Sequence, residues 1–204
     1  MNITVIGASG KTGREVVAQA LDAGHKVTAL VRRAEALQPQ AGLTIVVGDV
    51  TNPNDIGKVL KGADAAISAL GSMGADLMTA AIKAVTAASK NTGLQRFILL
   101  SASAVKRDQL APSLRVISGI VLKKAIRDKT ASEALLRASE LNWTIVHATA
   151  LTKKPKSEKL ARVVAGQEKI GMKHKIARAD VAAWMLHEVE AAQYPHKDVV
   201  ITGA

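Results

Sequence analysis

The sequence predicts an α/β protein built on a doubly wound parallel sheet, with helices covering both faces. Three observations support this fold class: apolar runs alternate with helical patterns, the runs are continuous rather than alternating in polarity, and a glycine-rich turn follows the first run. Continuous Val, Ile and Leu character is typical of strands buried on both faces, as they are in a parallel sheet. A chain of 204 residues is long enough to bury such a core, and we expect residues 1–204 to form one domain.

The N-terminal third follows a simple alternation of strands and helices. In chain order the expected elements are a strand at Ile3–Ile6, a helix at Gly13–Ala23, strands at Lys26–Val31 and Leu43–Val47, a helix at Asp55–Lys61 and a strand at Ala65–Leu70. Each strand is a run rich in β-branched or aliphatic residues. Gly24 ends the first helix, and Gly42 and Gly48 bound the third strand, because glycine favours the turns that terminate both kinds of element.

The remaining two thirds continue the alternation with two interruptions. In chain order the expected elements are a helix at Asp76–Thr92, a strand at Arg96–Ser101, a helix at Lys129–Glu140, a strand at Trp143–His147, a helix at Asp180–Ala191 and a short strand at Val199–Ile201. The first of these helices is rich in alanine and ends before Gly93. Residues 104–124 and 151–178 fit the alternation least well, so we expect them to form insertions on the substrate side of the fold.

The composition excludes several kinds of site. The chain has no cysteine, which rules out a disulfide-stapled fold, a thiolate metal site and a cysteine nucleophile. Its five histidines show no metal-ligand spacing, so we expect no metal. Two tryptophans, one tyrosine and one phenylalanine are too few for nucleic-acid readers that stack bases on aromatic rings. We find no targeting signal and no apolar stretch of membrane-spanning length, so we expect a cytoplasmic location.

Basic residues outnumber acidic ones by 28 to 17, which gives a formal net charge of +11. Most of the surplus lies in residues 103–204, and it is densest between residues 153 and 175. One interpretation is a lysine-rich surface that faces solvent, a second is the edge of a pocket for an anionic ligand, and a third is a nucleic-acid surface. The sequence carries no helix-turn-helix, zinc-finger or RNP motif, which argues against nucleic acid.

The glycine-rich turn Gly7-Ala8-Ser9-Gly10-Lys11-Thr12-Gly13 lies between the first expected strand and the first expected helix. In that place glycines permit a tight turn and a close approach of the backbone to a ligand, and free amides at the helix start face a pyrophosphate. The pattern is typical of a Rossmann-type, dinucleotide-binding fold. Gly10-Lys11-Thr12 also resembles the end of a nucleoside-triphosphate P-loop, but that motif requires a glycine where Val5 stands.

The second expected strand ends at Val31 and is followed by Arg32 and Arg33. In dinucleotide-binding folds this strand end meets the adenosine ribose, where a carboxylate favours a free 2′-hydroxyl and an arginine accommodates a 2′-phosphate. A guanidinium also pairs with phosphate bidentately. We therefore expect NADP(H) to be preferred over NAD(H), with one of the two arginines facing solvent.

Further motifs extend this pattern along nearly the whole chain. They are Val27-Thr28-Ala29-Leu30-Val31-Arg32, Val47-Gly48-Asp49-Val50, Ala66-Ile67-Ser68-Ala69-Leu70-Gly71, Leu99-Leu100-Ser101-Ala102-Ser103, Leu141-Asn142-Trp143-Thr144-Ile145-Val146 and Ile176-Ala177-Arg178-Ala179-Asp180-Val181-Ala182. With the glycine-rich turn, they make the chain similar to the atypical short-chain dehydrogenases/reductases. It specifically resembles the small NAD(P)-binding NmrA-like and biliverdin-IXβ/flavin reductase-like proteins.

The resemblance also implies where an NAD(P) cofactor binds. It places Gly7, Ser9, Gly10, Lys11, Thr12 and Gly13 around the pyrophosphate, Arg32 and Arg33 at the adenosine phosphate, Asp49 and Val50 beside adenine, Ala69, Leu70 and Gly71 along the middle of the cofactor, and Ser101 and Ser103 beside the nicotinamide. For Asp49, a carboxylate that accepts a hydrogen bond from the exocyclic amine of adenine is one reading, and a loop cap is the alternative.

The chain departs from this superfamily at the catalytic tyrosine. The superfamily transfers protons with a tyrosine four positions before a lysine, and here Ala125 stands four positions before Lys129. The single tyrosine, Tyr194, lies near the C-terminus in an expected loop. The remaining catalytic candidates are Ser103, Ser101 and Lys129, and a surface lysine is the alternative interpretation for Lys129.

These features lead to one main hypothesis and two alternatives. The main hypothesis is an NADPH-dependent reductase that transfers a hydride to a flat, electron-poor acceptor such as a flavin, quinone or tetrapyrrole. The loop Ser72-Met73-Gly74 and the basic stretch 151–175 would flank the acceptor, favouring an anionic one. A non-catalytic NADP(H) sensor of the NmrA-like type is the first alternative, and nucleic-acid binding is the second. His147 is either an acid–base group or a bonded structural histidine, and the oligomeric state, a homodimer included, stays open.

Overall fold

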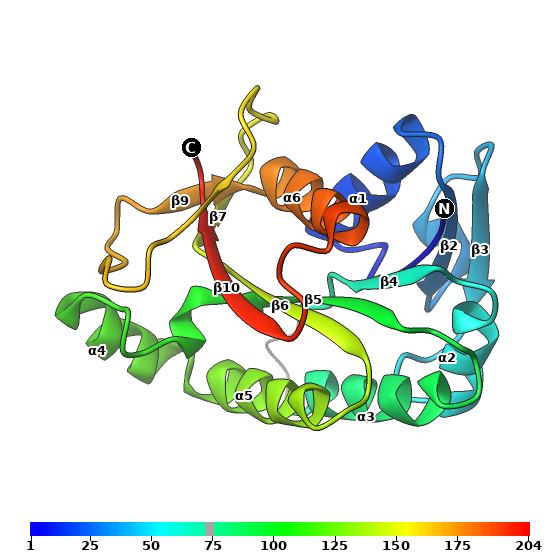
Figure 1. The fold of residues 1–204 in the computed structure, drawn as a ribbon, viewed down its shortest axis with the longest axis horizontal. Coiled ribbons are helices and arrows are strands. Elements are labelled where there is room, and N and C mark those ends of the chain that lie inside the picture. Colours follow the sequence, from blue (N-terminus) through cyan, green and yellow to red (C-terminus); the bar gives the residue numbers. More distant parts are fainter. Residues whose placement is uncertain (72–75) are drawn as a thin grey trace.

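The computed structural model describes residues 1–71 and 76–204 of the protein. At its centre lies an eight-stranded sheet with the order β3-β2-β1-β4-β5-β6-β10-β8 (Figure 1). Its strands are β1 (Asn2–Ile6), β2 (Lys26–Val31), β3 (Leu43–Val47), β4 (Ala65–Ser68), β5 (Arg96–Ala102), β6 (Asn142–Ala148), β8 (Arg162–Val163) and β10 (Lys197–Thr202). Neighbouring strands run parallel, except that the edge strand β8 is antiparallel to β10. This is the doubly wound α/β fold that the sequence predicts.

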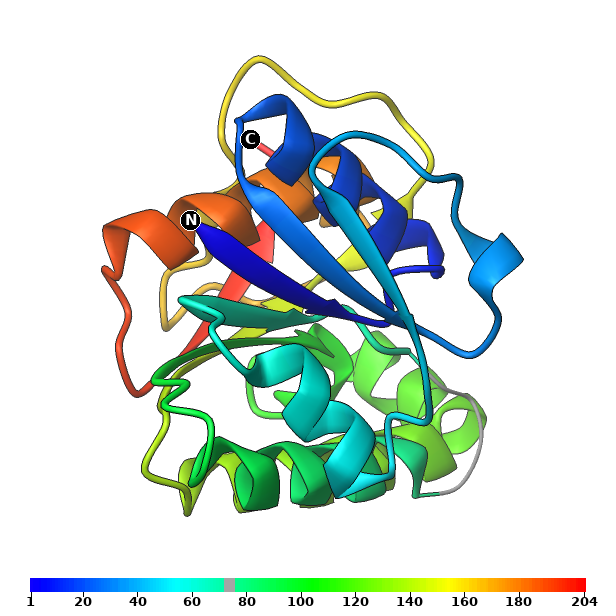
Figure 2. The same ribbon diagram turned by 90° about the vertical axis from the view of Figure 1, so that its right-hand side faces the viewer.

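Helices cover both faces of this sheet. On one face lie α1 (Lys11–Asp22) and α6 (Arg178–Ala191), and on the other lie α2 (Pro53–Leu60), α3 (Leu77–Ser89) and α5 (Lys123–Arg137) (Figure 1 and Figure 2). The remaining helix, α4 (Pro112–Val121), projects from one end of the molecule (Figure 1). The strand order reverses between β1 and β4, and doubly wound folds bind their ligands at this switch point, beyond the carboxyl ends of the strands.

Most of the core lies in two apolar layers, one on each side of the sheet, and a smaller cluster includes Leu110 and Ile170. Ile3 and Val5 of β1 contribute to the layer under α1 and α6, whereas Ile6 contributes to the layer under α2, α3 and α5. In β5, Ile98 and Leu99 are divided between the two layers in the same way. Successive side chains of a strand point to opposite faces, so a strand buried on both faces needs apolar residues at every position. This requirement explains the continuous apolar runs in the sequence.

The helical region after β5 differs from the expectation. Helix α5 begins at Lys123 rather than Lys129, and α4 occupies much of the predicted insertion at residues 104–124. The buried residues of α5 are Asp128, Ser132, Glu133 and Leu136. Because three of these four are polar, the helix lacks the apolar periodicity by which its start could be recognised.

The start of α3 is stabilised by a residue from α5. The backbone amides of Met78 and Thr79 each donate a 2.9 Å hydrogen bond to the carboxylate of Asp128, which is buried. A carboxylate at a helix N-terminus satisfies free amides and complements the helix dipole. The cap lies about fifty positions away along the chain, so a search for local capping residues does not find it.

The second predicted insertion, residues 151–178, contains only short strands. β7 (Ala150–Thr152) pairs with β9 (Lys175–Ala177) in a separate parallel ribbon, and β8 extends the main sheet. Across the two described ranges, no helix has the length and apolar character needed to cross a membrane.

Candidate functional site

The glycine-rich turn connects β1 to α1 at the switch point of the sheet. Gly7 has a φ of +80°, in the left-handed region that favours glycine, and its carbonyl oxygen accepts a 3.0 Å hydrogen bond from the Gly10 amide. A Cβ atom at Gly7 would lie 2.8 Å from the Leu70 nitrogen, and one at Gly13 would lie 2.1 Å from the Gly7 oxygen. The turn therefore packs directly against the backbone that follows β4, and side chains at these positions would disrupt that packing.

The N-terminus of α1 is suited to an anion. Its N-cap residue, Gly10, provides no side-chain hydrogen bond to the helix, and the first turn contains no acidic residue. The first-turn amides and the positive end of the helix dipole are thus left to a ligand. With the close approach at Gly7, this cradle fits the pyrophosphate of a dinucleotide.

Three arginines lie at the expected adenosine end of the site. Arg32 and Arg33 follow β2 and are exposed, and Arg33 lies 3.6 Å from the carboxylate of Glu35. Arg14, in the first turn of α1, donates hydrogen bonds to the carbonyl oxygens of Ser9 (3.1 Å) and Ala36 (2.5 Å). Arg14 thereby ties the glycine-rich turn to the segment after β2, a role that the sequence alone did not suggest.

Asp49 lies in the loop that follows β3. Its Oδ1 atom accepts 2.8 Å hydrogen bonds from the backbone amide and the hydroxyl of Thr51. These bonds, the amide bond first, hold the pKa of Asp49 below its ordinary value, and Arg32 acts in the same direction. The loop-cap interpretation of Asp49 is therefore realised in the structure, and its contact with adenine stays a prediction, as does that of Val50.

A pocket of about 440 Å³ opens beside the glycine-rich turn, and we call it the switch-point pocket. It is bounded by Gly10-Lys11-Thr12, by Ala69-Leu70-Gly71 after β4, by Leu100-Ser101-Ala102 of β5, and by Leu122, Ala125, Ile126 and Lys129. The segments that the sequence assigned to the middle and the nicotinamide end of the cofactor thus meet around one cavity. Its lining is largely apolar with a few polar groups, as is typical of small-molecule sites. The loop Ser72-Met73-Gly74, predicted to flank the acceptor, lies outside the described residues.

The pocket contains the position that the superfamily gives to its tyrosine. Ala125 and Lys129 lie one turn apart on α5, and both line the switch-point pocket. Burial lowers the pKa of Lys129, against the opposing effects of Glu133 and Asp128. Tyr194 lies in the turn just before β10, at the amino-terminal edge of the parallel sheet, and its ring stacks on Trp184 with centroids 5.8 Å apart. The only phenol is therefore at the edge opposite the pocket.

The two candidate serines differ in position. Ser101 lines the switch-point pocket and donates a 2.6 Å hydrogen bond to Oε1 of Glu133, a buried residue of α5. Glu133 also accepts a 2.9 Å hydrogen bond from Arg137. Ser103 is buried in a short 3₁₀ turn and is not among the residues that line the pocket. The structure thus brings Ser101 and Lys129 together, but not Ser103.

His147 is enclosed between Glu133 and Asp198. Its Nδ1 atom lies 3.3 Å from the Ala102 carbonyl oxygen and 3.7 Å from Glu133 Oε1, and its Nε2 atom lies 4.0 Å from Asp198 Oδ1. Burial lowers the pKa of His147, against the opposing effect of Glu133. Glu133 reaches His147 from α5 and Asp198 reaches it from β10, so the two carboxylates meet there only in the folded chain.

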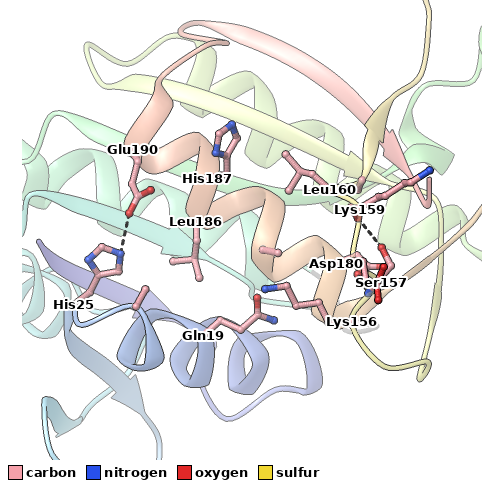
Figure 3. Close-up of a pocket in the computed structure, with 14 residues that line it drawn as sticks. Gln19, His25, Lys156, Ser157, Lys159, Leu160, Asp180, Leu186, His187 and Glu190 are labelled. Carbon is pink, nitrogen blue, oxygen red and sulfur yellow. Dashed lines mark hydrogen bonds and ion pairs between the residues drawn. The ribbon is translucent and has the colours of Figure 1, made fainter.

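The basic stretch lies mainly away from the switch-point pocket. A second pocket, of about 350 Å³, lies between α1, α6 and the segment 156–161, and Figure 3 shows its lining residues. Lys156 and Lys159 line it, together with His25 and Glu190, whose Nε2 and Oε1 atoms lie 3.1 Å apart. Of the stretch 151–175, only Leu151 lines the switch-point pocket in the described chain. The lysines of this stretch are all exposed to solvent, four of them in the protruding 153–160 segment. Their place beside an acceptor therefore stays a prediction.

Comparison with known proteins supports a nucleotide-binding role. A family model described as NAD(P)H-binding matches residues 7–192. The Photosystem II assembly factor Ycf39 of Cyanophora paradoxa is 31% identical over 153 residues, which cover 71% of this chain and 44% of that protein. The chain spans less than half the length of the Ycf39 relatives that it matches.

Two solved structures illustrate the similarity in fold. The anaerobilin reductase ChuY of Escherichia coli O157:H7 is 26% identical, with a TM-score of 0.82 over 99% of this chain and 97% of that chain. A short-chain dehydrogenase/reductase of Veillonella parvula in complex with NADP has a TM-score of 0.86 at 17% identity, covering 100% of this chain and 94% of that chain. The likeness confirms the Rossmann-type fold expected from the sequence.

Proposed function

Since this chain belongs to the NAD(P)H-binding family of atypical short-chain dehydrogenases/reductases, we propose that it is an NADPH-dependent reductase of a flat, electron-poor acceptor. The bound cofactor supplies the hydride. The observation that carries this proposal is Ala125, which faces the switch-point pocket where a proton-donating phenol would be needed for alcohol or sugar chemistry. Flavins, quinones and tetrapyrroles need positioning against the nicotinamide more than a strong enzymic acid, because solvent can protonate their reduced forms.

The chain's own residues have binding and orienting roles in this proposal. The cradle of Gly7, Gly10 and Gly13 holds the pyrophosphate, and Lys129 holds the nicotinamide ribose. Ser101 orients the acceptor, since its hydroxyl hydrogen is directed toward Glu133 and its lone pairs are left for a ligand. Arg32, directly after β2, binds the 2′-phosphate of NADPH.

Charge around the pocket supports an anionic acceptor. Lys11, Lys129 and Arg178 line the switch-point pocket, and no acidic side chain is among its lining residues in the described chain. Flavin phosphates and tetrapyrrole propionates would be attracted to such a lining. The similarity to ChuY, whose name identifies it as an anaerobilin reductase, favours the tetrapyrrole class among these acceptors.

The test is the oxidation of NADPH by the purified chain with a panel of flavin, quinone and tetrapyrrole acceptors, followed by absorbance. We expect at least one acceptor to be reduced, and Lys129→Met to slow that reaction. A chain that binds NADPH but oxidises it with no member of the panel contradicts the proposal.

A second candidate function is a cofactor sensor that binds NADP(H) without catalysis. Relatives with the name of an assembly factor favour it. The readout that supports this candidate is a difference between the NADP⁺- and NADPH-bound chain in limited proteolysis, with no turnover of any acceptor.

A further inference from the structure

The outer surface of helix α4 is apolar and exposed. Val116, Ile117, Ile120 and Val121 have between 53% and 76% of their surface accessible to solvent. Their spacing places them on one face of the helix, which we call the α4 stripe. The opposite face is anchored, because Ser118 is buried and Leu114 packs against an apolar cluster that includes Ile170. Exposed apolar side chains normally occur singly, so a contiguous group of four marks an interaction surface.

Basic residues flank this stripe along the chain. Residues 109–127 contain four basic residues, Arg115, Lys123, Lys124 and Arg127, and no acidic residue. All four are exposed. Arg115 lies on α4, and the other three lie on α5, where Arg127 is 3.5 Å from the carboxylate of Asp76. The chain as a whole carries a formal charge of +11. The combination of an apolar face with flanking lysines and arginines is typical of helices that lie in the headgroup region of a membrane.

The position of α4 is also suited to a flat partner. Figure 1 shows α4 at one end of the long axis of the molecule, projecting beyond the sheet and its covering helices. A projecting helix can enter a deformable surface while most of the fold stays outside that surface. We propose that the α4 stripe docks the protein peripherally on an anionic lipid bilayer, with Ile117 and Ile120 inserted among the acyl chains and the cations at the headgroups.

Other occupants fit these observations less well. A second copy of the chain in a two-fold dimer would place each stripe and its four cations opposite the same four cations, which repel. Nucleic acid would attract the cations but would leave the Val and Ile side chains without an apolar partner. An anionic bilayer satisfies both parts of the surface.

Docking would bring the switch-point pocket to the membrane surface. Leu122 lines that pocket directly after the stripe ends at Val121, and Ala125 and Ile126 follow one turn later. An acceptor dissolved in the bilayer would then reach the pocket from the lipid side. The docking itself is independent of the proposed reductase activity, and vesicle binding can be measured without any turnover.

The experiment measures co-sedimentation of the full chain with vesicles of phosphatidylcholine alone and of phosphatidylcholine mixed equally with phosphatidylglycerol. We expect binding only to the mixed vesicles. Ile120→Asp should lower the partition coefficient about tenfold or more, because an aspartate cannot enter the acyl region. Lys123→Gln with Lys124→Gln should lower it roughly thirtyfold, at about 1 kcal/mol for each lysine near the surface, and high salt should remove that difference.

Leu160→Asp is the matched control. Leu160 is 45% exposed in the basic 153–160 segment, and its substitution changes the net charge by the same amount as Ile120→Asp. A loss of binding equal to that of Ile120→Asp would overturn the proposal, because charge alone would then explain both. Absence of binding to mixed vesicles would overturn it too. If Ile120→Asp instead dissociates a dimer seen by sedimentation velocity, the stripe contacts a second copy and the lipid proposal is wrong. Unchanged thermal unfolding confirms that each variant folds.

Discussion

The hydroxyl of Ser101 donates a 2.6 Å hydrogen bond to Oε1 of Glu133, which connects the end of β5 to α5 beneath the switch-point pocket. Glu133 is buried, and its second oxygen accepts a hydrogen bond from Arg137. A serine hydroxyl has one hydrogen, so Ser101 can present only its lone pairs to the pocket. It is therefore prepared to accept a hydrogen bond from a cofactor amide or an acceptor N–H group.

Replacement of Ser101 by alanine should lower kcat/KM about tenfold, the effect expected for the loss of one hydrogen bond to a bound ligand. The dissociation constant of NADPH should change much less, since the pyrophosphate and the adenosine contacts remain. Steady-state kinetics and a fluorescence titration of NADPH measure the two quantities. Ser103→Ala is the comparison, because Ser103 does not line the pocket. An equal loss in both variants would contradict a direct role for Ser101.

A second prediction concerns the adenosine end of the cofactor site. Arg32→Ala should weaken NADPH binding by roughly tenfold to a hundredfold, since a charge-assisted hydrogen bond contributes about 1.5–3 kcal/mol. NADH binding should be almost unchanged, because NADH lacks the 2′-phosphate. Arg33→Ala should have a smaller effect, since Arg33 is 79% exposed and faces Glu35. Isothermal titration with both cofactors provides the measurement, and an equal loss of NADPH and NADH affinity would exclude the 2′-phosphate contact.

The sheet could be predicted closely because burial on both faces leaves a continuous apolar signal. β2 and β3 have the predicted bounds, Lys26–Val31 and Leu43–Val47. The glycine-rich turn was also recognisable, because Gly7 and Gly13 must lack a side chain where the backbones of β1, α1 and the segment after β4 converge. Such local constraints require particular residue types at fixed positions, so the sequence alone indicates them.

The polar interior could not be predicted, because its partners are far apart along the chain. Asp128 caps α3, and Glu133 binds Ser101, yet both residues have the spacing of an ordinary solvent-facing helix surface. Because the buried face of α5 is mostly polar, the sequence pattern did not indicate that the helix includes its first six residues, 123–128. The basic stretch 153–175 shows the opposite situation: its density of lysines is clear in the sequence, but the sequence does not indicate that Lys156 and Lys159 line the pocket between α1 and α6.

A pH dependence follows from the ion-paired cluster around Glu168. Hydrogen bonds from Arg162 and then from His174 lower the pKa of Glu168 from 4.5 to about 2. Because its folded-state pKa lies below the value in the unfolded chain, the carboxylate stabilises the fold above pH 4.5, and this stabilisation is lost as the pH falls toward 2. Carboxyl-carbon NMR should give a Glu168 midpoint near 2.

Substitution of Glu168 by glutamine should reduce the steepness with which stability falls over that acidic range, in urea unfolding measured at a series of pH values. Glu158→Gln, on the exposed segment before β8, serves as the control for the removal of one surface carboxylate. A Glu168 midpoint near 4.5 would show that the cluster does not form in solution.

Two glycine substitutions should act in opposite directions. At Gly13, a Cβ atom would lie 2.1 Å from the Gly7 oxygen and 2.8 Å from the Ala8 Cα atom, so only a shift of backbone could relieve the contact. Gly13→Ala should lower the free energy of unfolding by about 3 kcal/mol and weaken NADPH binding, because it displaces the pyrophosphate cradle.

At Gly57 within α2, the nearest atom to a new Cβ is 4.0 Å away. Gly57→Ala should stabilise the protein by about 0.5–1 kcal/mol, since alanine loses less backbone entropy in a helix. Urea unfolding measures the stability of both variants, and titration measures their affinity for NADPH. A Gly13→Ala protein as stable as Gly57→Ala would mean that the β1–α1 turn is not packed as described.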